Sequence, residues 1–317
     1  LLSHGRDEYR TKIRQALTRA VGASVIEKQR PMIRKLVGDI LLDLKRSEGS
    51  DMLHKVAFGV PSSLFCIWFG APLEDAPWIA ELSDRILKIF SFDRQYTPGI
   101  ISAYDELFPY VQKRIDEALT SPKDNLLAHF IAENKAGHLT DTELFHIVAM
   151  FNEASTDNTA HGIATAMGNL LGDKQRWQQL IDDPELIPAA INENMRLSGR
   201  INTLIRYASH DIEYGGVQIP EGTGINFFIP AAHRDPRVFS SPLEYDPRRT
   251  DAHNLLDFGG GVYTCLGKHV AIIEIQEALA ELISSYPDAQ VTSFDINSNP
   301  FVNEVAELEV DLSGASS

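Results

Sequence analysis

Hydrophobic residues recur at helical spacing through the first two thirds of the chain. Over residues 7–21, Ile13 and Leu17 stand four positions apart among charged residues, and residues 25–47 continue the pattern. Apolar positions three or four residues apart line one face of a helix. We expect the prolines of this region, Pro109 included, at turns or first helical positions rather than inside helices. The same spacing predicts further helices over 51–69, 73–90, 100–119 and 123–134.

One long helix is predicted in the middle of the chain. Thr140 and Glu143 stand three residues apart, as in a capping box at a helix start. No proline interrupts the sequence from there to Leu171. A helix of roughly 30 residues is about 45 Å long at 1.5 Å per residue, which is enough to cross a whole domain.

After residue 200 the pattern changes to short alternating segments between turns. Gly215 and Gly216 separate two of these segments, which is typical of a hairpin turn. Residues 234–261 are rich in Pro, Asp, Arg and Gly and are expected to be irregular, and a helix is expected again over about 266–285. The predicted strands lie at 211–214, 217–219, 224–229, 289–291 and 307–312.

No internal repeat, low-complexity segment or Ser/Gly-rich linker divides the chain. We therefore expect one domain over residues 1–317. Its fold class is predicted to be mainly α with small β-sheets to one side.

The composition favours a folded, soluble protein. Of the 317 residues, 44% are hydrophobic and 23% are charged, so the chain can bury a full core. The formal net charge of −15 disfavours binding to nucleic acid or to anionic membrane surfaces. The opening residues do not resemble a signal peptide, and the most apolar run, residues 60–69, is too short to span a bilayer. We expect a cytoplasmic protein without a membrane anchor, and its two cysteines, Cys66 and Cys265, suit a reducing compartment.

A glycine-rich segment places Cys265 just before a predicted helix. Its sequence is Phe258-Gly-Gly-Gly261-Val-Tyr-Thr-Cys265-Leu-Gly267. Glycines let backbone N–H groups turn toward the sulfur, and a helix N-terminus stabilises negative charge, so both features lower the pKa of a thiol. Cys265 is therefore a candidate nucleophile or metal ligand.

Four other interpretations of this segment fit less well. A structural cysteine in the core does not explain three consecutive glycines, and their spacing is not that of a dinucleotide-binding loop. A phosphate-binding P-loop needs Ser or Thr after Gly267-Lys268, where the chain has His269. A zinc site could use Cys265 and His269, but no second Cys/His pair lies nearby in the sequence to complete four ligands.

The segment resembles the haem-binding loop of the cytochrome P-450 family, F-x-x-G-x-x-x-C-x-G. Phe258, Gly261, Cys265 and Gly267 occupy its defined positions. The resemblance implies that the Cys265 thiolate ligates the iron of haem b and that the other three residues belong to the haem-binding loop. Further motifs of the family occur, in the family's order, along essentially the whole chain.

Two of these motifs imply an ion-pair network that braces the Cys265 loop. Glu193-Asn-Met-Arg196 is similar to the family's E-x-x-R, in which residues i and i+3 share one helix face. Residues 245–249 are similar to F-D-P-x-R, and the resemblance adds Arg249 to the pair. The role implied for the network is structural rather than catalytic. Between the motifs, the family's A-N-R-D-P is matched with His233 where Asn is usual.

Four further residues match positions from which the family pairs the haem propionates. Arg206 resembles the arginine of the family's R-x-x-x-x-D, and Arg10 and Arg14 stand where its early H-x-x-x-R lies. Tyr263 replaces the His or Arg two residues before the cysteine, and its phenol can still donate a hydrogen bond. Two carboxylates facing a buried macrocycle need such partners.

The predicted long helix carries the residues with which the family activates oxygen. Ala154-Ser-Thr-Asp157-Asn158-Thr159 resembles A-G-x-D/E-T-T, in which the acid and the alcohol conduct protons to bound dioxygen. Asp157 is the candidate proton-relay acid. Asn158 replaces the usual threonine and can position a water, but it passes a proton less readily, and Thr159 is a weaker substitute. Ser155 replaces the usual glycine. Alternatively, Asp157 and Asn158 are only polar residues at a mid-helix kink.

The resemblance implies a haem-thiolate monooxygenase that inserts one oxygen atom from dioxygen into a small hydrophobic or aromatic substrate. Electrons come from an external ferredoxin and its reductase, because the chain has no flavin or iron–sulfur segment. The residues predicted to form a basic docking patch for this partner are Lys12, Arg19, Lys268 and His269. The residues predicted to line the substrate pocket are Phe151, Ala154, Asn202, Thr203, Leu204, Phe301 and Val302.

Two alternatives stay open. One is a haem-thiolate enzyme of other chemistry, such as peroxygenation, dehydration or oxidative coupling, and it is suggested by Asn158 in place of threonine. The other is an inactive haem-binding fragment. Residue 7 already corresponds to the start of the family's early haem-contacting helix, so we expect an N-terminally short member of the family.

Overall fold

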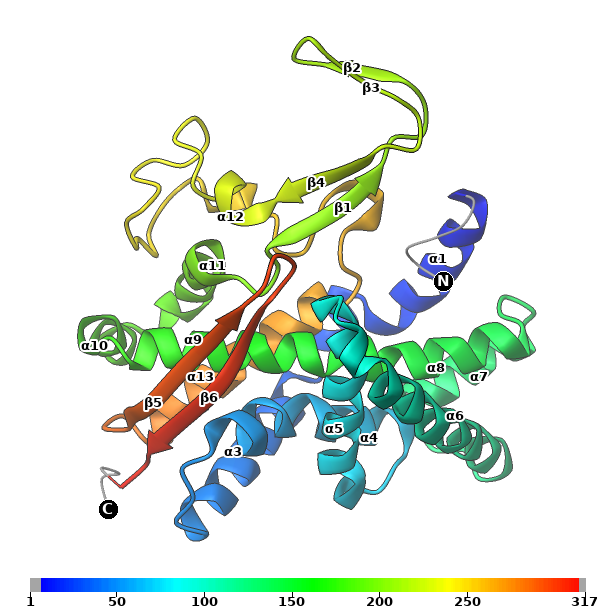
Figure 1. Cartoon of the computed structure of the whole chain (residues 1–317). Helices are drawn as coiled ribbons and strands as arrows, with labels where there is room; N and C mark the ends of the chain where they lie inside the picture. Colours follow the sequence, from blue (N-terminus) through cyan, green and yellow to red (C-terminus); the bar gives the residue numbers. More distant parts are fainter. Residues whose placement is uncertain (1–6, 314–317) are drawn as a thin grey trace.

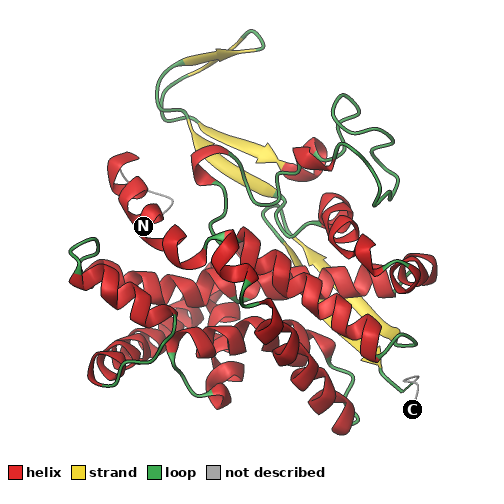
Figure 2. Cartoon of the chain, turned by 180° about the vertical axis from the view of Figure 1, so that it is seen from behind, coloured by secondary structure: helices red, strands yellow, loops and turns green. Residues whose placement is uncertain are grey.

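The computed structural model describes residues 7–313 and is dominated by helices. They gather into one body in which α8 and α9 run through the middle, and the strands lie along one side of it (Figure 1; Figure 2). The α-helices are α1 (Asp7–Val21), α2 (Ala23–Glu27), α3 (Arg30–Arg46), α4 (Gly59–Phe69), α5 (Ala76–Leu87), α6 (Thr97–Thr120), α7 (Leu126–Lys135), α8 (Asp141–Ser155), α9 (Asp157–Leu171), α10 (Lys174–Asp182), α11 (Ile187–Ser198), α12 (Ile229–Ala232) and α13 (Lys268–Ser285).

The strands form antiparallel pairs. β1 pairs with β4, and β2 pairs with β3 in a hairpin that projects from the helical body (Figure 1). Gly215 and Gly216 turn this hairpin with φ of +57° and +80°, values that side chains disfavour, as the sequence predicted. β5 pairs with β6 beside α9. The strands are β1 (Thr203–Tyr207), β2 (Ile212–Tyr214), β3 (Val217–Ile219), β4 (Gly224–Phe228), β5 (Gln290–Ser298) and β6 (Asn303–Asp311).

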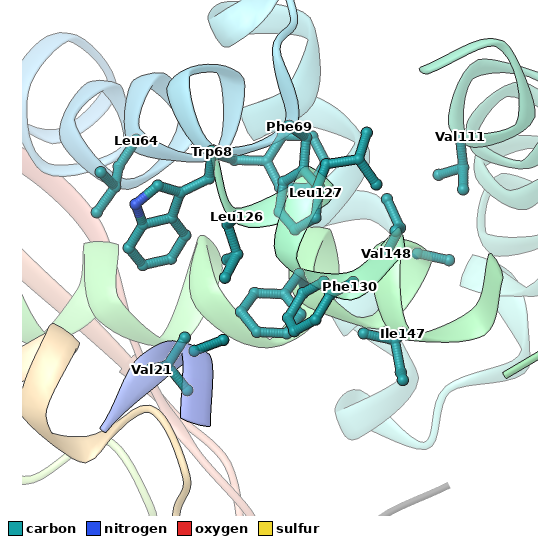
Figure 3. Close-up of a cluster of buried hydrophobic side chains, with 14 of the residues drawn as sticks. Val21, Leu64, Trp68, Phe69, Val111, Leu126, Leu127, Phe130, Ile147 and Val148 are labelled. Atoms are coloured by element: carbon teal, nitrogen blue, oxygen red, sulfur yellow. The ribbon is translucent and has the colours of Figure 1, made fainter. Parts of the chain in front are cut away.

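An aromatic cluster joins α4, α7 and α8 in the interior (Figure 3). The ring of Phe151 lies 5.6 Å from that of Phe69, 5.4 Å from that of Phe130 and 6.3 Å from that of Trp68. All four side chains are buried. Aromatic pairs at such distances add to the free energy of area burial, so the cluster fixes α8 against its neighbours.

The predicted long helix is broken at Thr156, between α8 and α9. Ser83 of α5 reaches this break: its Oγ donates to the Asn152 carbonyl at 3.2 Å and accepts from the Asp157 N–H at 3.3 Å. Ser155 Oγ also donates to the Phe151 carbonyl at 2.5 Å. The prediction of one uninterrupted helix is therefore wrong, because a side chain from another helix supplies hydrogen bonds that the helix would otherwise make itself.

Other element boundaries also differ from the prediction. The expected helix 25–47 is divided into α2 and α3, and Pro109 lies inside α6 rather than at a turn. Pro109 is tolerated on an exposed face because α6 packs against α5 and α8 along its length. β1 was not predicted, and β5 and β6 extend beyond the expected segments because they pair with each other. The fold class itself, mainly α with small β-sheets, is confirmed. Among residues 7–313, no helix has both the length and the apolar character needed to cross a membrane.

Replacing Phe151 with Ala is expected to reduce the free energy of unfolding by about 3–5 kcal/mol, because it removes the ring at the centre of this cluster. Urea denaturation measures the loss. The matched control is Tyr214→Ala, whose side chain is 80% exposed and whose removal should change stability by less than about 0.5 kcal/mol. Equal losses for the two variants would contradict the role assigned to Phe151.

Candidate functional site

The loop that carries Cys265 is closed by its own backbone. The Cys265 N–H donates to the Phe258 carbonyl at 2.8 Å, so residues 258–265 form a compact turn ahead of α13. Gly259 and Gly261 have φ of +69° and +64°, which glycine adopts without strain. The shape of the loop therefore favours glycine at positions 259 and 261, whereas Gly260 and Gly267 have φ of −151° and −81°, which any residue can adopt.

The Cys265 thiol is free and its residue is exposed. The backbone N–H groups of Gly267 and Lys268 and the charge of Arg14 stabilise a thiolate at this position. Burial of the sulfur among loop atoms outweighs them and raises the pKa of the Cys265 thiol. The expectation of a lowered pKa is thus not met in the protein alone, although the predicted N–H donors are present.

Basic side chains gather around Tyr263, two residues before Cys265. Arg10 Nη1 donates to the Tyr263 hydroxyl at 3.0 Å, and the Cζ atoms of Arg10 and Arg206 lie 4.7 Å and 5.0 Å from the Tyr263 ring centroid. Arg14 Nη2 donates to the Thr264 carbonyl at 2.9 Å. The fold therefore brings Arg10, Arg14, Arg206 and Tyr263 together from three distant parts of the chain, and the three guanidinium groups make this side of the loop suited to anionic groups.

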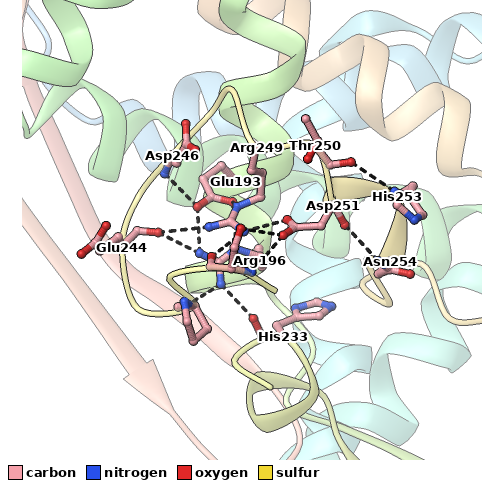
Figure 4. A network of polar contacts seen from close by, with 12 residues as sticks. Glu193, Arg196, His233, Glu244, Asp246, Arg249, Thr250, Asp251, His253 and Asn254 are labelled. Carbon is pink, nitrogen blue, oxygen red and sulfur yellow. Dashed lines mark hydrogen bonds and ion pairs between the residues drawn. The ribbon is translucent and has the colours of Figure 1, made fainter. Parts of the chain in front are cut away.

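A buried ion-pair network holds the chain that leads into the Cys265 loop (Figure 4). Arg196 Nε and Nη2 each donate to Glu193 at 2.8 Å, and Arg249 Nε lies 2.7 Å from Glu193 Oε2. Arg196 also donates to the carbonyls of His233, Pro242 and Glu244. The structure thus brings Glu193, Arg196 and Arg249 together, and the guanidinium fixes backbone that lacks regular secondary structure.

Asp257, which the sequence did not indicate, lies immediately before this loop without a hydrogen-bond partner among the described residues. Its side chain is 7% exposed, and burial raises the pKa of its carboxyl to about 7. His233 Nε2 is 3.7 Å away but accepts the Leu256 N–H at 2.8 Å, so it is not protonated. Consistently, burial lowers the pKa of His233 to about 4. Asp257 is therefore a buried acid that forms no ion pair with a Lys or Arg side chain among the described residues, although the charge of Lys268 partly opposes the rise of its pKa.

The central helices present a narrow accessible stripe in an otherwise buried surface. Ala154 is exposed and Asn158 is partly exposed one turn later, so these two predicted oxygen-site residues share a face. Asp157 and Thr159 are buried, with 1% and 5% exposure. The structure therefore leaves Ser155 and Asn158 as the partly accessible polar residues of this motif and buries Asp157.

Asp157 is held in a buried ion pair that the sequence did not reveal. Arg200 Nη2 donates to Asp157 Oδ2 at 2.6 Å, and His161 Nε2 lies 3.5 Å from Asp157 Oδ1. His161 Nδ1 accepts the Val305 N–H, which leaves the proton on Nε2. Burial opposes ionisation, but His161 and Arg200 outweigh it and lower the pKa of Asp157. Asp157 is therefore not free to act as a proton-relay acid in this structure. Its ion pair with Arg200 has to open before its carboxylate can carry a proton.

The predicted pocket residues fall into two groups. Phe151 lies in the aromatic core and Val302 is 2% exposed, so neither is free to line a pocket. Asn202 is also buried, and its Nδ2 donates to the Asn299 carbonyl at 2.8 Å, which fixes the β5–β6 turn. The second group is partly or fully exposed and consists of Ala154, Thr203, Leu204 and Phe301. The Phe301 ring lies 4.2 Å from that of Phe92.

The predicted basic patch is only partly free. Arg19 Nε donates to Glu133 at 2.9 Å, and Lys12 lies 3.7 Å from Glu143. Lys268 and His269 are exposed next to the Cys265 loop. Among the side chains that the structure describes, no group of three His, Cys, Asp or Glu could hold a metal ion by itself.

Replacing Arg200 with Leu is expected to reduce the free energy of unfolding by about 3–5 kcal/mol, because the Asp157 carboxylate is then buried without its cation. Urea denaturation measures the loss, and adding Asp157→Asn should restore part of it. The matched control is Arg237→Leu, which breaks a surface pair with Asp235 and should cost at most about 1 kcal/mol. Full additivity of the two buried substitutions would show that the pair is not coupled.

Replacing Asp257 with Asn is expected to raise stability above pH 7. An unfolded aspartate titrates near pH 4, whereas burial raises the pKa of folded Asp257 to about 7, so ionisation penalises only the folded state. The penalty is absent below about pH 4 and complete above pH 7. The gain in unfolding free energy over the wild type should therefore grow by up to about 4 kcal/mol between pH 4 and pH 8. Asp235→Asn is the control, because Arg237 lowers the pKa of Asp235 to about 2, outside this range.

Comparisons with known proteins agree with the geometry. The Cytochrome P-450 family model matches residues 2–287. Nocardicin C N-oxygenase from Nocardia uniformis subsp. tsuyamanensis is 31% identical over 282 residues, which is 87% of this chain and 69% of that protein. Luteothin monooxygenase from Streptomyces thioluteus is 30% identical over 264 residues, 82% of this chain and 65% of that protein. The chain thus spans about two thirds of the length of these relatives.

Solved structures show the same fold. CxnD, a cytochrome P-450 enzyme for C–S bond formation in chuangxinmycin biosynthesis, aligns with a TM-score of 0.87 and 26% identity over 98% of this chain and 77% of that one. Cytochrome P-450 CREJ, in complex with (4-ethylphenyl) dihydrogen phosphate, aligns with a TM-score of 0.89 and 26% identity over 98% of this chain and 79% of that one. The family match, the relatives and the shared fold show that the chain belongs to the cytochrome P-450 family of monooxygenases.

Proposed function

We propose that this protein inserts one oxygen atom from dioxygen into a small hydrophobic or aromatic organic substrate at a haem b bound to Cys265. The family supplies the reaction class. The observation that carries the proposal is the position of free Cys265 in a loop whose Tyr263 is contacted by Arg10 and Arg206. A thiolate donor beside a cluster of cations matches a cofactor that has an iron centre and two carboxylates.

The residues around Cys265 fit haem. The N–H groups of Gly267 and Lys268 stabilise negative charge on the sulfur, and Arg10, Arg14, Arg206 and Tyr263 would pair the propionates. Phe258, Gly261 and Gly267 would shape the loop. When bound there, haem supplies the activation of dioxygen, which no side chain of the protein can perform.

We assign the handling of protons to α8 and α9. Asn158 lies on the accessible stripe, where its amide can donate to an oxygen-containing group and its carbonyl can hold a water. Asp157 is the acid next to it, and it reaches that face only when its ion pair with Arg200 opens. Thr159 is buried, so we give it a packing role or at most an indirect one.

Two features support the partners that we propose. The accessible Leu204 and the adjacent rings of Phe301 and Phe92 provide apolar contacts, which suit a hydrophobic or aromatic substrate. Lys268 and His269 are exposed beside the Cys265 loop of an otherwise acidic protein, which suits docking of an acidic electron carrier such as a ferredoxin.

The absorption spectrum of the reduced, carbonyl-bound protein tests the haem assignment. The wild-type protein should give the red-shifted Soret band of a thiolate ligand, and Cys265→Ser should lose that shift while its haem content is recorded separately. Cys66→Ser is the matched control, because Cys66 is buried and its thiol pKa is raised to about 12. An unshifted band in the wild type would overturn every haem-thiolate interpretation.

Product formation then separates the reaction types. Turnover with a ferredoxin, its reductase and dioxygen supports monooxygenation, whereas turnover with hydrogen peroxide alone supports a peroxygenase. The buried ion pair of Asp157 and the presence of Asn158 are the features that favour the peroxygenase as second candidate, because both weaken proton delivery.

A further inference from the structure

A second cavity, of about 980 Å³, lies between α3, α4, α5 and β6. The three helices stand at the end of the helical body opposite the β2–β3 hairpin (Figure 1). The cavity reaches α9 at His161, which is 3% exposed. Among the described residues that line it, none belongs to the Cys265 loop, and neither Ala154 nor Asn158 is included. Small-molecule sites usually measure about 300–1,000 Å³, so this cavity is large enough to be a separate ligand site.

The wall of this cavity is mostly apolar. The Phe58 ring centroid lies 5.4 Å from that of His161 and 6.2 Å from that of His54. Ser63, which is 8% exposed, also lines the cavity, and its hydroxyl forms no hydrogen bond with another described residue. The wall therefore suits an apolar ligand body, and the Ser63 hydroxyl is available to a ligand oxygen or a water. Its apolar members include Leu44, Leu53, Phe58, Ala76, Ala80 and Val305.

The acidic residues that line the cavity from α5 and β6 are paired with cations. Lys88 Nζ lies 3.1 Å from Asp84 Oδ1 and 3.1 Å from Glu304 Oε2, which also ties the chain after α5 to β6. Arg85 Nη1 lies 3.3 Å from Glu81 Oε1. Because opposite charges at these separations largely cancel, these acids present little negative charge to a ligand.

The cations that line the cavity from α3 and the helical turn η1 (Leu53–Ala57) have no such partners. Arg46 is the last residue of α3 and Lys55 lies in η1, and both are exposed. Neither forms an ion pair with another described residue, and the same holds for Asp43, the acid on this wall. Two unpaired cations thus face one unpaired acid, which leaves a local positive surplus on a protein of net charge −15.

We propose that this cavity binds an amphiphilic carboxylate. Its hydrocarbon body lies against Phe58 and the other apolar side chains, and its carboxylate meets Arg46 and Lys55 at the mouth. The anionic class follows from charge complementarity, because the unpaired charge around the cavity is mainly positive. The site goes beyond the proposed function and does not depend on it, since the cavity shares no described residue with the Cys265 loop.

Calorimetric binding of matched probes to the haem-loaded full chain tests this inference. The probes are octanoate, 1-octanol and octyltrimethylammonium, which share a hydrocarbon body and differ in the charge of the head. We expect octanoate to bind about three- to fivefold tighter than 1-octanol, as exposed ion pairs provide, and octyltrimethylammonium to bind most weakly. The net charge of −15 favours the cation at the surface in general, so a preference for the anion has to come from a local site. Equal or tighter binding of octyltrimethylammonium would overturn the inference.

Variants of the lining residues locate the binding. Arg46→Gln combined with Lys55→Gln should remove the preference for octanoate, whereas Lys35→Gln, which removes a cation of α3 outside the cavity, should keep it. Ala80→Trp places a large ring in the cavity and should weaken the binding of all three probes at least about tenfold. If octanoate binds Ala80→Trp as tightly as the wild type, or if Lys35→Gln acts like the double variant, the inference is wrong.

A gain of binding guards against variants that merely fold poorly. Asp43→Asn removes the unpaired acid of the same wall and should raise the preference for octanoate about twofold, which a disordered protein does not do. The carbonyl spectrum is recorded on the same samples. A thiolate band in a wild type that does not prefer octanoate overturns only this inference. A preference for octanoate in a wild type without the thiolate band overturns the proposed function and supports this inference.

Discussion

The buried guanidinium of Arg196 organises the side of the molecule that carries Cys265. Arg196 pairs with Glu193 on its own helix and donates to three backbone carbonyls in residues 233–244, a segment with little regular structure. Arg249 joins the same carboxylate. Irregular backbone has few hydrogen bonds of its own to fix its conformation. The buried guanidinium of Arg196, with its several N–H donors, holds this backbone in one conformation. The Cys265 loop follows directly from this braced segment.

The central helix shows how tertiary contacts assign different tasks to similar residues. Ser83 of α5 completes the hydrogen bonding at the break beside Thr156, which separates the face of Asp157 from that of Ala154 and Asn158. Asp157 is compensated by the buried guanidinium of Arg200, which follows α11 in the chain. Asn158, the residue after Asp157, stays partly exposed. Neighbouring polar residues of the motif are thus treated differently: Asp157 is fixed in an ion pair and Asn158 is accessible.

Much of the fold was accessible from the sequence because its signals are local. The 3.6-residue spacing gave the helices, the pair Gly215-Gly216 gave the β2–β3 turn, and the capping box at Thr140 is present as expected. The break at Thr156 was missed, since it depends on Ser83, whose two partners at the break lie 69 and 74 positions away in the chain. Arg200 was missed for the same reason, because nothing in the residues next to it indicates that it pairs with Asp157.

The sequence by itself determined the family motifs, the helical class and the identity of Cys265 as the central chemical group, because these are recorded in residue type and spacing. Only the tertiary structure decided which polar residues are buried in ion pairs and which stay accessible to solvent. It buried Asp157 beside Arg200, placed Phe151 in the aromatic core and left Asn158 partly exposed. Burial and long-range pairing depend on how helices pack against each other, and packing depends on contacts that are not adjacent in the chain.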